Sequence, residues 1–534
     1  MELIKEGNSA EAIDAVGAMF KLIARLRDEN NRRALQIARM VRENYGRRSE
    51  SVDAHQLSLF LKSVTEDDQA QEDEASAENE ARIDALRLEL KELRELKKKG
   101  KGRRPGGRNP LPEDLPRETI TLSVSDEERT CEQCEGEKKT IGFAKSQVLE
   151  FIPASFKVIV YEREKVACKV CESGLATAPT ADKVIESGLP GPGLLAHVVV
   201  SKYLEHMPIH RLAQRYRQLG VPLPASTLGQ WTGVVADNPI PLYSALKDDL
   251  LAAHVLGADD TGIKVLDKKA SANVRRGAMW AYVAYEQGKP ALALFEYAPN
   301  RKGIHPRAFL NGRKGYIQGD GYQGLDRMFA GPAPPECVKV GCMMHVRRYF
   351  KKALDAGDLR AAVPVDLIAR LYSVEALATE KDLPCEERQA LRASHSKPLM
   401  DRLHRWATKL YPQAEPSSPL GRALTHCLGQ WDSVTVYLAD GAIPIDNGEV
   451  ERRIRPVALG RKNWLFAGSD KAAQRSAVIF SLMACCLLAD IEPLNWLTDI
   501  LTRLCQGWPN SRLHELLPHQ WAKAQTKSSP SEAA

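Results

Sequence analysis

Three acidic residues that lie far apart in the sequence are the residues best suited to chemistry. Asp259 lies in VLGADDTGIKV, Asp320 in GYIQGDGYQG and Glu451 in IPIDNGEVERRIRP. Carboxylate oxygens are hard ligands that suit Mg²⁺ or Mn²⁺, and two such ions about 3.5 to 4 Å apart can stabilise both the attacking and the leaving oxygen of a phosphodiester. We therefore predict a two-metal site for phosphoryl transfer. For each residue alone, the alternative is an ordinary surface carboxylate among the 69 acids of the chain.

The segment around Glu451 indicates a polyanionic substrate. It runs from Asp446 to Ser469 and is rich in Arg and Lys, which neutralise phosphates beside an acidic metal site. Glu449 is a rival third ligand, but at helical spacing it points roughly 200° away from Glu451, so that only one of the two can face the sheet. The predicted DNA contacts here are Arg452, Arg455, Arg461, Lys462 and the stacking surface of Trp464.

A second group of candidates follows the segment CVKVGCM. His345 lies beside Arg347 and Arg348, and we predict that all three contact DNA, with His345 near a phosphate or a leaving oxygen. The alternative for His345 is a hydrogen-bonded residue that closes a strand. Asp260 and Asp326 are also near the carboxylates in sequence, and we interpret both as bystanders.

The elements that must position these residues begin at Val255. The segments VLGAD, MWAYVAYE and ALALFEYA predict three strands, HPRAFL predicts a short helix and YIQGD a fourth strand. RNase H-like nuclease and integrase cores begin with this order. It places Asp259 on the first strand and Asp320 at the end of the fourth, and CVKVGCM is a candidate fifth strand. Residues from about 351 to 442 carry helical patterns only, which predicts a large helical insertion before Glu451.

Four cysteines have the spacing of a metal site. Cys131 and Cys134 form one CxxC pair, Cys168 and Cys171 form another, and 33 residues separate the pairs. Four thiolates at two such turns can close a tetrahedral shell around Zn²⁺. The intervening VLEFIPASFKVIVYERE alternates like a β-ribbon. A redox function would need only one pair, so we predict structural zinc.

Two further segments before the core have features of DNA binding. Seven Lys or Arg residues lie between Lys97 and Arg108 among Gly and Pro; we predict that Arg103 and Arg104 contact phosphates, and a solvated linker is the alternative. Farther along, IHRLAQRYRQLGVPLPASTLGQWTG predicts a helix, a turn and a second helix capped by Ser226 or Thr227. This is the outline of a helix-turn-helix, which a plain helical hairpin would also produce.

The N-terminal region predicts helices without visible chemistry. In the leucine-rich part, apolar residues follow an a/d pattern that is short for a coiled coil. It fits either a contact between two protomers or a hairpin packed on the preceding helix. The pattern is formed by Ile83, Leu86, Leu90 and Leu93.

Composition sets limits on the class of protein. The chain has 534 residues, 43% of them hydrophobic and 27% charged, and a net charge of +6, which indicates a modular soluble protein whose DNA contacts must come from local clusters. The N-terminus lacks the pattern of a signal peptide. The most apolar stretch, 477–489, is too short to span a bilayer and predicts a buried helix. We expect a cytoplasmic protein, without membrane attachment, whose other cysteines are reduced.

An ordered series of segments resembles the transposases of the insertion sequence 66 family. It comprises the leucine-rich helix with its GRRPGGR tail, the CEQC and CKVC pairs, GPGLLAHVVVSKYLEHMPIHR, ADDTGIKVLD, QGDGYQGLDR, CMMHVRRYF, IDNGEVERRIRPVALGRKNWLFAGS and LLPHQW. Together they cover nearly the whole chain, and the block ending in AGS is the most specific.

The resemblance implies a multidomain protein with an α/β RNase H-like catalytic core. Its D-D-E triad would be Asp259, Asp320 and Glu451, which favours Glu451 over Glu449. It also implies two Mg²⁺ or Mn²⁺ ions and a structural Zn²⁺. The enzyme would bind the terminal inverted repeats of its element, cleave the DNA and join the 3′-hydroxyl to target DNA. It would act as a homo-oligomer on DNA, with accessory proteins of the same element as further candidate partners.

Two departures from the family pattern concern positioning around the triad. Asp260, Thr261 and Gly262 stand where the family usually has Glu-Thr-Pro, and Gly448 stands where it has a second Asn. Two alternatives to the transposase are a non-catalytic DNA-binding protein derived from one and a structure-selective nuclease.

The domain organisation predicted from the sequence has seven parts. They are an N-terminal helical region (1–65), a leucine-rich coiled-coil segment (76–100), a basic linker (101–125), a zinc ribbon (126–176), a helix-turn-helix-like region (190–250), the catalytic core (251–475, with the insertion at about 351–442) and a C-terminal helical region (476–525).

Overall fold

The computed structural model describes residues 74–100, 117–121, 143, 149, 155–166, 176–186, 188–270, 272–326, 329 and 336–528. The helix predicted within residues 1–65, the linker arginines Arg103 and Arg104 and the four cysteines Cys131, Cys134, Cys168 and Cys171 lie outside the described residues. The chain forms two compact units, one of residues 1–92 and 162–534 and one of residues 93–161. The sheet, the candidate site and the helices around them belong to the first unit.

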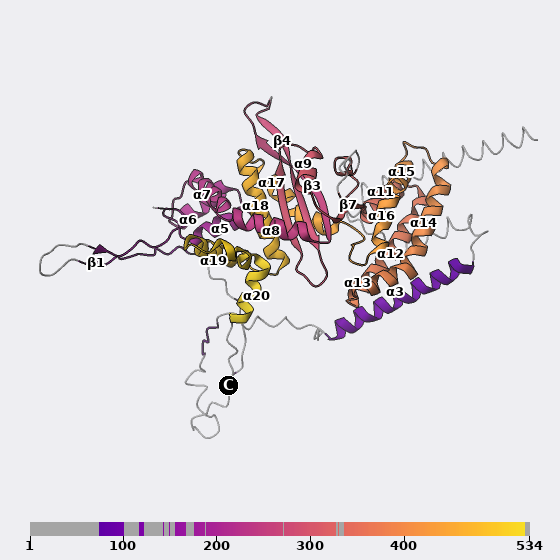
Figure 1. Cartoon of the computed structure of the whole chain (residues 1–534), viewed down its shortest axis with the longest axis horizontal. Helices are drawn as coiled ribbons and strands as arrows, with labels where there is room; N and C mark the ends of the chain where they lie inside the picture. The colour runs from indigo at the N-terminus through magenta and orange to yellow at the C-terminus, as the bar shows by residue number, and fades with distance from the viewer. Residues whose placement is uncertain are drawn as a thin grey trace, which may run out of the picture. The chain divides into compact units, whose positions relative to one another are not determined.

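A mixed five-stranded sheet forms the centre of this unit (Figure 1). Its strands are β3 (Val255–Leu266), β4 (Val274–Tyr285), β5 (Leu292–Ala298), β6 (Gly315–Gln318) and β7 (Cys337–Val340), in the order β5-β4-β3-β6-β7. Strands β3, β4 and β5 are antiparallel neighbours, whereas β6 is parallel to β3 and β7 is parallel to β6. The predicted strands are therefore confirmed, as is the short helix before the fourth strand, α9 (Ile304–Phe309).

Helices that precede and follow the sheet in the sequence pack on it. Helix α17 (Gly448–Trp464) packs on β3 and β4, α18 (Asp470–Leu488) packs on β5, and α8 (Ile240–Ala252) contacts β4 and β5. Helix α18 is long and apolar enough to cross a membrane, but 67% of its apolar window is buried inside the protein. The buried helix predicted at 477–489 is confirmed as part of this core helix.

The helices before the sheet include the predicted helix-turn-helix outline. Helix α5 (Pro192–Tyr203) precedes α6 (Ile209–Gln218) and α7 (Ala225–Asp237), and Gly220 lies in the turn with φ +84°. Helix α7 begins directly after Pro224 and has no side-chain cap, so the predicted cap by Ser226 or Thr227 is wrong. Proline sets the extended entry to the helix by its fixed φ instead. Helix α19 (Pro493–Cys505) packs against α5.

The predicted helical insertion is confirmed. After α11 (Met343–Asp355) come α12 (Ala362–Glu380), α13 (Cys385–Leu391), α14 (Lys397–Leu410), α15 (Pro419–Gly429) and α16 (Trp431–Thr435). Arg392 is fully buried among them. Its guanidinium donates to both carboxylate oxygens of Glu375 at 2.8 Å and to the carbonyl oxygens of Tyr437, Asp440 and Ile443. Arg392 therefore fixes the chain that leads from the insertion back to α17.

The leucine-rich segment forms the helix α3 (Glu74–Gly100), whose Ile83, Leu86 and Leu90 are buried. It contacts α12 of the same chain: Arg87 lies 3.4 Å from the hydroxyl oxygen of Ser373, and Glu89 lies 2.6 Å from Lys381 Nζ. A contact with the insertion was not foreseen from the a/d pattern. A coiled coil between protomers remains a prediction.

Strand pairing beside the CxxC pairs is short. Strand β1 (Lys165–Val166) pairs with β2 (Ala176–Thr177) in antiparallel register. Residues 155–164 form no strand, so the predicted β-ribbon is not formed in this described part of the segment. The side chains from Val158 to Tyr161 are exposed there, and therefore the alternation of this segment does not reflect a buried face.

Candidate active site

The parallel pairing of β3 with β6 brings Asp259 and Asp320 onto neighbouring chain segments in the middle of the sheet. Gly257 pairs with Gln318, and each aspartate lies two residues farther along its chain in the same direction. Neighbouring strands are about 4.8 Å apart. Two carboxylates that are 61 positions apart in the sequence are therefore held by adjacent backbones.

The N-terminus of α17 brings Glu451 to the same place. Asn447, just before the helix, donates from Nδ2 to the carbonyl oxygen of Ala258 at 3.0 Å. Strand β3 carries Gly257 where it approaches the start of α17 most closely. A Cβ on this residue would lie 2.5 Å from Asn447 Oδ1 and 2.6 Å from Val450 Cγ2. Only glycine fits this position, and its lack of a side chain allows α17 to begin directly beside Asp259.

The three carboxylates interact electrostatically. Burial, together with the negative charges of Asp320, Asp260 and Glu451, raises the pKa of Asp259 to about 8. The hydrogen bond that Asp259 Oδ1 accepts from the backbone N–H of Asp260, at 2.7 Å, opposes this rise. A cation bound here would lower the pKa of Asp259 again, because it stabilises the ionised carboxylate.

Glu451 is paired with α11, while Glu449 is held elsewhere. Both carboxylate oxygens of Glu451 accept from Arg348 at 3.2 Å, and one lies 3.5 Å from His345 Nε2. Burial and the charge of Arg348 lower the pKa of His345, against the opposing effect of Asp320 and Glu451. Glu449 instead forms ion pairs with Arg452 and Arg453. The two glutamates therefore face different partners, as their helical spacing requires.

Asp260 has a structural partner that the sequence did not reveal. Its side chain is 1% exposed, and its two oxygens accept from Arg301 Nε and Nη2 at 2.6 Å each. The Arg301 guanidinium lies 4.3 Å from the ring centre of Tyr322, whose backbone N–H donates to Asp320 Oδ1 at 2.8 Å. Arg301 thus connects the strand of Asp259 with the loop of Asp320.

The insertion contacts the Asp320 loop from another side. Gly321 has φ +82°, and a Cβ there would lie 3.3 Å both from His426 Cε1 and from Gln430 Cδ. The His426 ring stacks on Tyr349 with 4.3 Å between centres, and burial and His345 lower its pKa. The nearby Asp326 lies 2.9 Å from Lys339 Nζ and accepts from Gln430. The sequence pattern gave no signal for His426, since it lies in a helix without other chemistry.

The chemistry of the three carboxylates fits a divalent cation, although Glu451 is turned to Arg348. In the described part of the chain, no three His, Cys, Asp or Glu side chains are arranged to hold a metal ion. The donors are nevertheless hard oxygens of the kind that Mg²⁺ prefers. Repulsion between the carboxylates contributes, with burial, to the raised pKa of Asp259. A bound cation would relieve this repulsion. Glu451 would have to exchange Arg348 for the cation.

Sequence comparisons identify the family. The profile of the Transposase IS66 family matches residues 187–475, which include all three carboxylates. The chain belongs to this family. Three further profiles match outside this range: transposase C of IS166 homeodomain at 34–120, the zinc-finger binding domain of transposase IS66 at 128–172 and the IS66 C-terminal element at 481–519. Membership in the insertion sequence 66 family is therefore confirmed.

Relatives of similar length occur in Sinorhizobium fredii (strain NBRC 101917 / NGR234). The uncharacterized protein y4hP is 32% identical over 511 residues, which cover 92% of this chain and 88% of the relative. The uncharacterized protein y4jD is 29% identical over 432 residues, or 79% of this chain and 84% of the relative. The similarity thus extends over the helical regions as well as the sheet.

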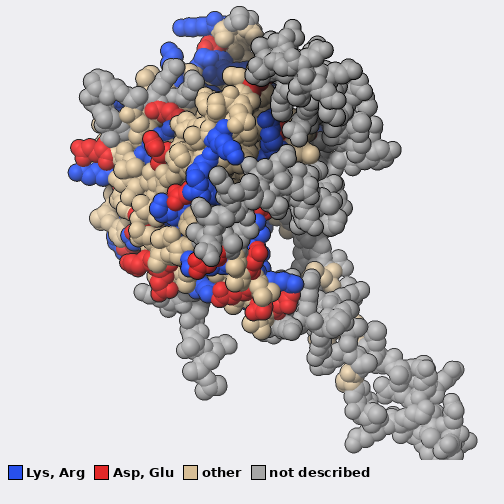
Figure 2. Space-filling model, turned by 90° about the vertical axis from the view of Figure 1, so that its right-hand side faces the viewer, with Lys and Arg blue, Asp and Glu red and all other residues tan. Residues whose placement is uncertain are grey.

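The basic residues predicted to contact DNA differ in their surroundings. Arg455 and Lys462 are exposed on α17 of this IS66-family chain and form no ion pair with described residues, whereas Arg461 donates to the Thr261 hydroxyl at 2.7 Å. The Trp464 indole nitrogen is buried close to Gly460. On the face shown in Figure 2, Lys and Arg side chains gather in a band across the centre.

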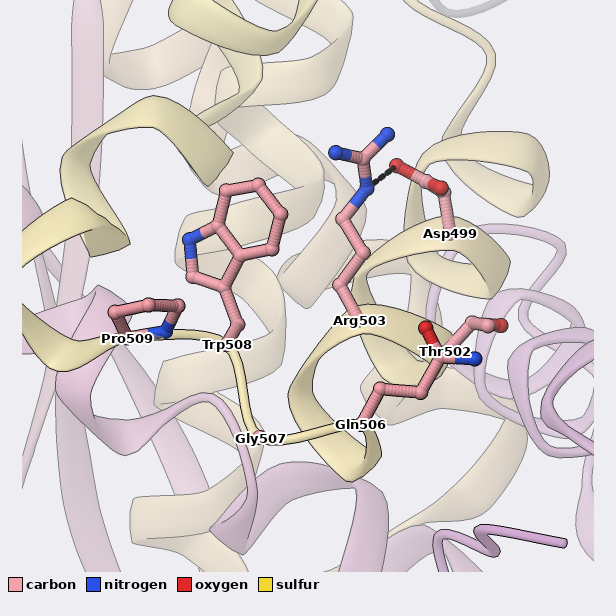
Figure 3. A pocket seen from close by; sticks show the side chains of 7 residues that line it. All are labelled: Asp499, Thr502, Arg503, Gln506, Gly507, Trp508 and Pro509. Carbon is pink, nitrogen blue, oxygen red and sulfur yellow. Dashed lines mark hydrogen bonds and ion pairs between the residues drawn. The ribbon is translucent and has the colours of Figure 1, made fainter.

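A separate shallow pocket of about 430 Å³ lies at the end of α19 (Figure 3). It is lined by Asp499, Arg503 and Trp508 among others, and Arg503 donates to Asp499 at 2.7 Å. The Arg512 guanidinium lies 4.8 Å from the centre of the Trp508 ring and is paired with Glu515. Since both cations have acidic partners, we assign no chemistry to this pocket.

Proposed function

We propose that this chain is a D-D-E transposase that binds the terminal inverted repeats of its element, cleaves the DNA there and joins the freed 3′-hydroxyl ends to target DNA. The observation that carries the proposal is the convergence of Asp259, Asp320 and Glu451, from β3, the loop after β6 and α17. The strand order, with three antiparallel strands followed by two parallel ones, supports an RNase H-like core.

In the proposed mechanism both reactions are in-line displacements at phosphorus. Two bound Mg²⁺ or Mn²⁺ ions would activate the attacking oxygen and stabilise the leaving oxygen. Asp259, Asp320 and Glu451 would hold these ions. Arg348, which neutralises Glu451 in the structure, would be released from it and would then be available, beside His345, for a phosphate of the DNA. Arg347, on the same helix, would contribute a further phosphate contact.

We propose that DNA contacts come from several parts of the chain. Arg452, Arg455, Arg461 and Lys462 line the helix that carries Glu451, which supports phosphate contacts beside the site. Trp464 would support this surface from within. The linker with Arg103 and Arg104, the helix-turn-helix-like region and the zinc domain would recognise the repeat ends. Because transposition brings two ends together, at least two chains would assemble on DNA, with accessory proteins of the element as candidate partners.

A strand-joining assay tests this function. The purified chain is incubated with Mg²⁺ or Mn²⁺, a labelled duplex of the sequence that flanks its reading frame and a target plasmid. We expect a labelled product joined to the plasmid, and none from the Asp259→Asn variant, which should still bind the end. Cleavage without joining would instead indicate a structure-selective nuclease. Binding without either reaction, also with accessory proteins added, would indicate a non-catalytic DNA-binding protein.

The zinc site is tested separately. We propose that Cys131, Cys134, Cys168 and Cys171 hold one Zn²⁺, which the match of the zinc-finger profile supports. Cys131→Ser or Cys171→Ser should release zinc and weaken binding to the repeat ends, since such domains fold around their metal. Specific end binding by a zinc-free protein would contradict this function of the domain.

A further inference from the structure

The chain makes a strained turn where α17 ends. Leu465 has φ +66° and ψ −45°, and the backbone N–H of Phe466 donates to the carbonyl oxygen of Trp464 at 2.8 Å. A hydrogen bond between residues two apart around a positive φ defines a γ-turn that is rare and strained for any residue except glycine. Such strain persists only where the surrounding structure imposes it, and it is concentrated at functional sites.

Contacts on both sides fix this turn. After it, the Ala467 N–H donates to the carbonyl oxygen of Lys264 at 2.8 Å, and the Leu266 N–H donates to that of Ala467 at 2.9 Å, so the chain joins the end of β3. Before it, the Leu465 N–H donates to the carbonyl oxygen of Arg461 at 3.1 Å, and the Trp464 indole packs against Gly460, where a Cβ would lie 2.7 Å from its nitrogen. The turn therefore cannot relax to an unstrained backbone conformation.

The strained turn presents apolar side chains to solvent. Leu465 is 60% exposed and Phe466 is 42% exposed. Large exposed apolar side chains at a fixed turn indicate a binding surface rather than packing. We call Leu465 and Phe466 the apolar tip.

The surroundings of the apolar tip match DNA. At helical spacing, Arg455, Leu459 and Lys462 follow one another along one side of α17, which ends just before the apolar tip, and Arg455 and Lys462 are exposed without an ion pair among described residues. A second copy of the chain that docked by the same face would bring like charges together. A polyanion would instead be attracted to this face.

The same helix connects the apolar tip with the carboxylates. Glu451 lies 14 residues before Leu465, which is about 21 Å along a helix axis. That length corresponds to roughly six base pairs at 3.4 Å per pair. DNA that follows α17 from the carboxylates would therefore meet the apolar tip about six pairs from the scissile phosphate.

We propose that Leu465 and Phe466 form a wedge that enters the base stack of the transposon-end DNA. Apolar side chains that insert between base pairs unstack them and bend the duplex. This inference rests on the proposed function, on its DNA binding for the wedge itself and on the position of the scissile phosphate at the carboxylates for the distance of six pairs. The turn holds the apolar tip under strain in the free protein. The tip is therefore already placed for insertion when DNA binds.

Fluorescence of 2-aminopurine tests the wedge. Duplexes of the flanking sequence carry the probe at one position at a time, from three to nine pairs from the cleavage point, with Ca²⁺ in place of Mg²⁺ to prevent cutting. We expect a several-fold rise at one position about six pairs away. Leu465→Gly and Phe466→Ala should each reduce this rise at least fivefold and change the Kd for the duplex less than threefold. Leu487→Ala removes another exposed leucine (46%), on α18, and should leave the rise unchanged.

The melting temperature of the variants and the mass of their assemblies in solution separate a wedge from other functions of the apolar tip. Since glycine accepts the γ-turn without strain, Leu465→Gly should melt at the same or a higher temperature than the unaltered protein. A lower melting temperature, or a fluorescence rise that both variants retain, would overturn the wedge. If Phe466→Ala changed the number of chains in the DNA-free assembly, as measured by its mass in solution, the apolar tip would be a protein contact instead. Failure of the unaltered protein to bind the duplex would refute the proposed function itself, whereas binding without unstacking would refute only the wedge.

Discussion

Removal of Arg301 should weaken both the fold around the carboxylates and their chemistry. Asp260 is nearly fully buried, with a side chain only 1% exposed, and Arg301 donates to both of its oxygens at 2.6 Å. In Arg301→Ala the carboxylate would remain buried without its partner. Such losses amount to about 3 to 5 kcal/mol for fully buried pairs. Because half of the Arg301 side chain is exposed, we expect about 1 to 3 kcal/mol.

The functional effect follows from the position of Tyr322. Without the guanidinium over its ring, the segment that holds Asp320 through the Tyr322 N–H is less restrained. We expect a 10- to 100-fold lower rate of end cleavage, equivalent to about 1.4 to 2.8 kcal/mol of activation free energy, together with a higher Mn²⁺ concentration for half-maximal rate.

The assays are denaturant unfolding and Mn²⁺-dependent cleavage of a labelled end. Asp260→Asn combined with Arg301→Ala should be more stable than Arg301→Ala alone, because a neutral amide costs less to bury than a carboxylate. Arg275→Ala is the matched control: it breaks ion pairs with Asp267 and Asp470 at the far end of β3 and should not change the Mn²⁺ requirement. If Arg301→Ala left both stability and Mn²⁺ requirement unaltered, the positioning argument would be refuted.

Two further predictions concern stability. Burial raises the pKa of Glu296 to about 7, although Lys247 opposes this rise. The folded state therefore favours the protonated form of Glu296, and the free energy of unfolding of the protein falls as the pH rises from about 4.5 to 7. Glu296→Gln should therefore stabilise the protein at pH 8 by at most about 3 kcal/mol and have little effect at pH 4.5. Denaturant unfolding at both pH values measures this difference, and an equal gain in stability at both would contradict the prediction. Arg392→Met should cost about 3 to 5 kcal/mol, since it removes both hydrogen bonds of the buried Glu375 carboxylate to Arg392 and leaves only Arg388, at 4.0 Å. Hydrogen exchange should then increase from Tyr437 to Ile443, and unchanged exchange there would count against the assigned function of Arg392.

The sequence predicted the elements around the site better than their contacts. The strand that carries Asp259 and the strand that precedes Asp320 follow from local alternation and flanking glycines, which are properties of short segments. The separation of Glu449 from Glu451 follows from helix geometry alone. These features depend on neighbours within a few residues, and the structure agrees with them.

Contacts between distant segments were not predictable in the same way. Asp260 seemed a bystander because its partner Arg301 lies 41 residues away and no periodicity links them. His426 reaches the Asp320 loop only because α15 folds back onto it. The strain at Leu465 arises where α17 ends and the chain joins β3, and no property of the segment WLFAG by itself reveals it. The strand pattern after the first CxxC pair misled, because alternation alone does not ensure pairing.

The central claim, that Asp259, Asp320 and Glu451 together carry out metal-dependent phosphoryl transfer, is tested most directly by comparing four single variants in one cleavage assay with Mn²⁺. Asp259→Asn, Asp320→Asn and Glu451→Gln should each lower the cleavage rate at least a thousandfold while the repeat end is still bound. Glu449→Gln, which changes a neighbouring acid whose partners are Arg452 and Arg453, should remain within a few-fold of the unaltered protein. Cleavage that survives loss of any of the three carboxylates, or that depends on Glu449 instead of Glu451, would contradict the account.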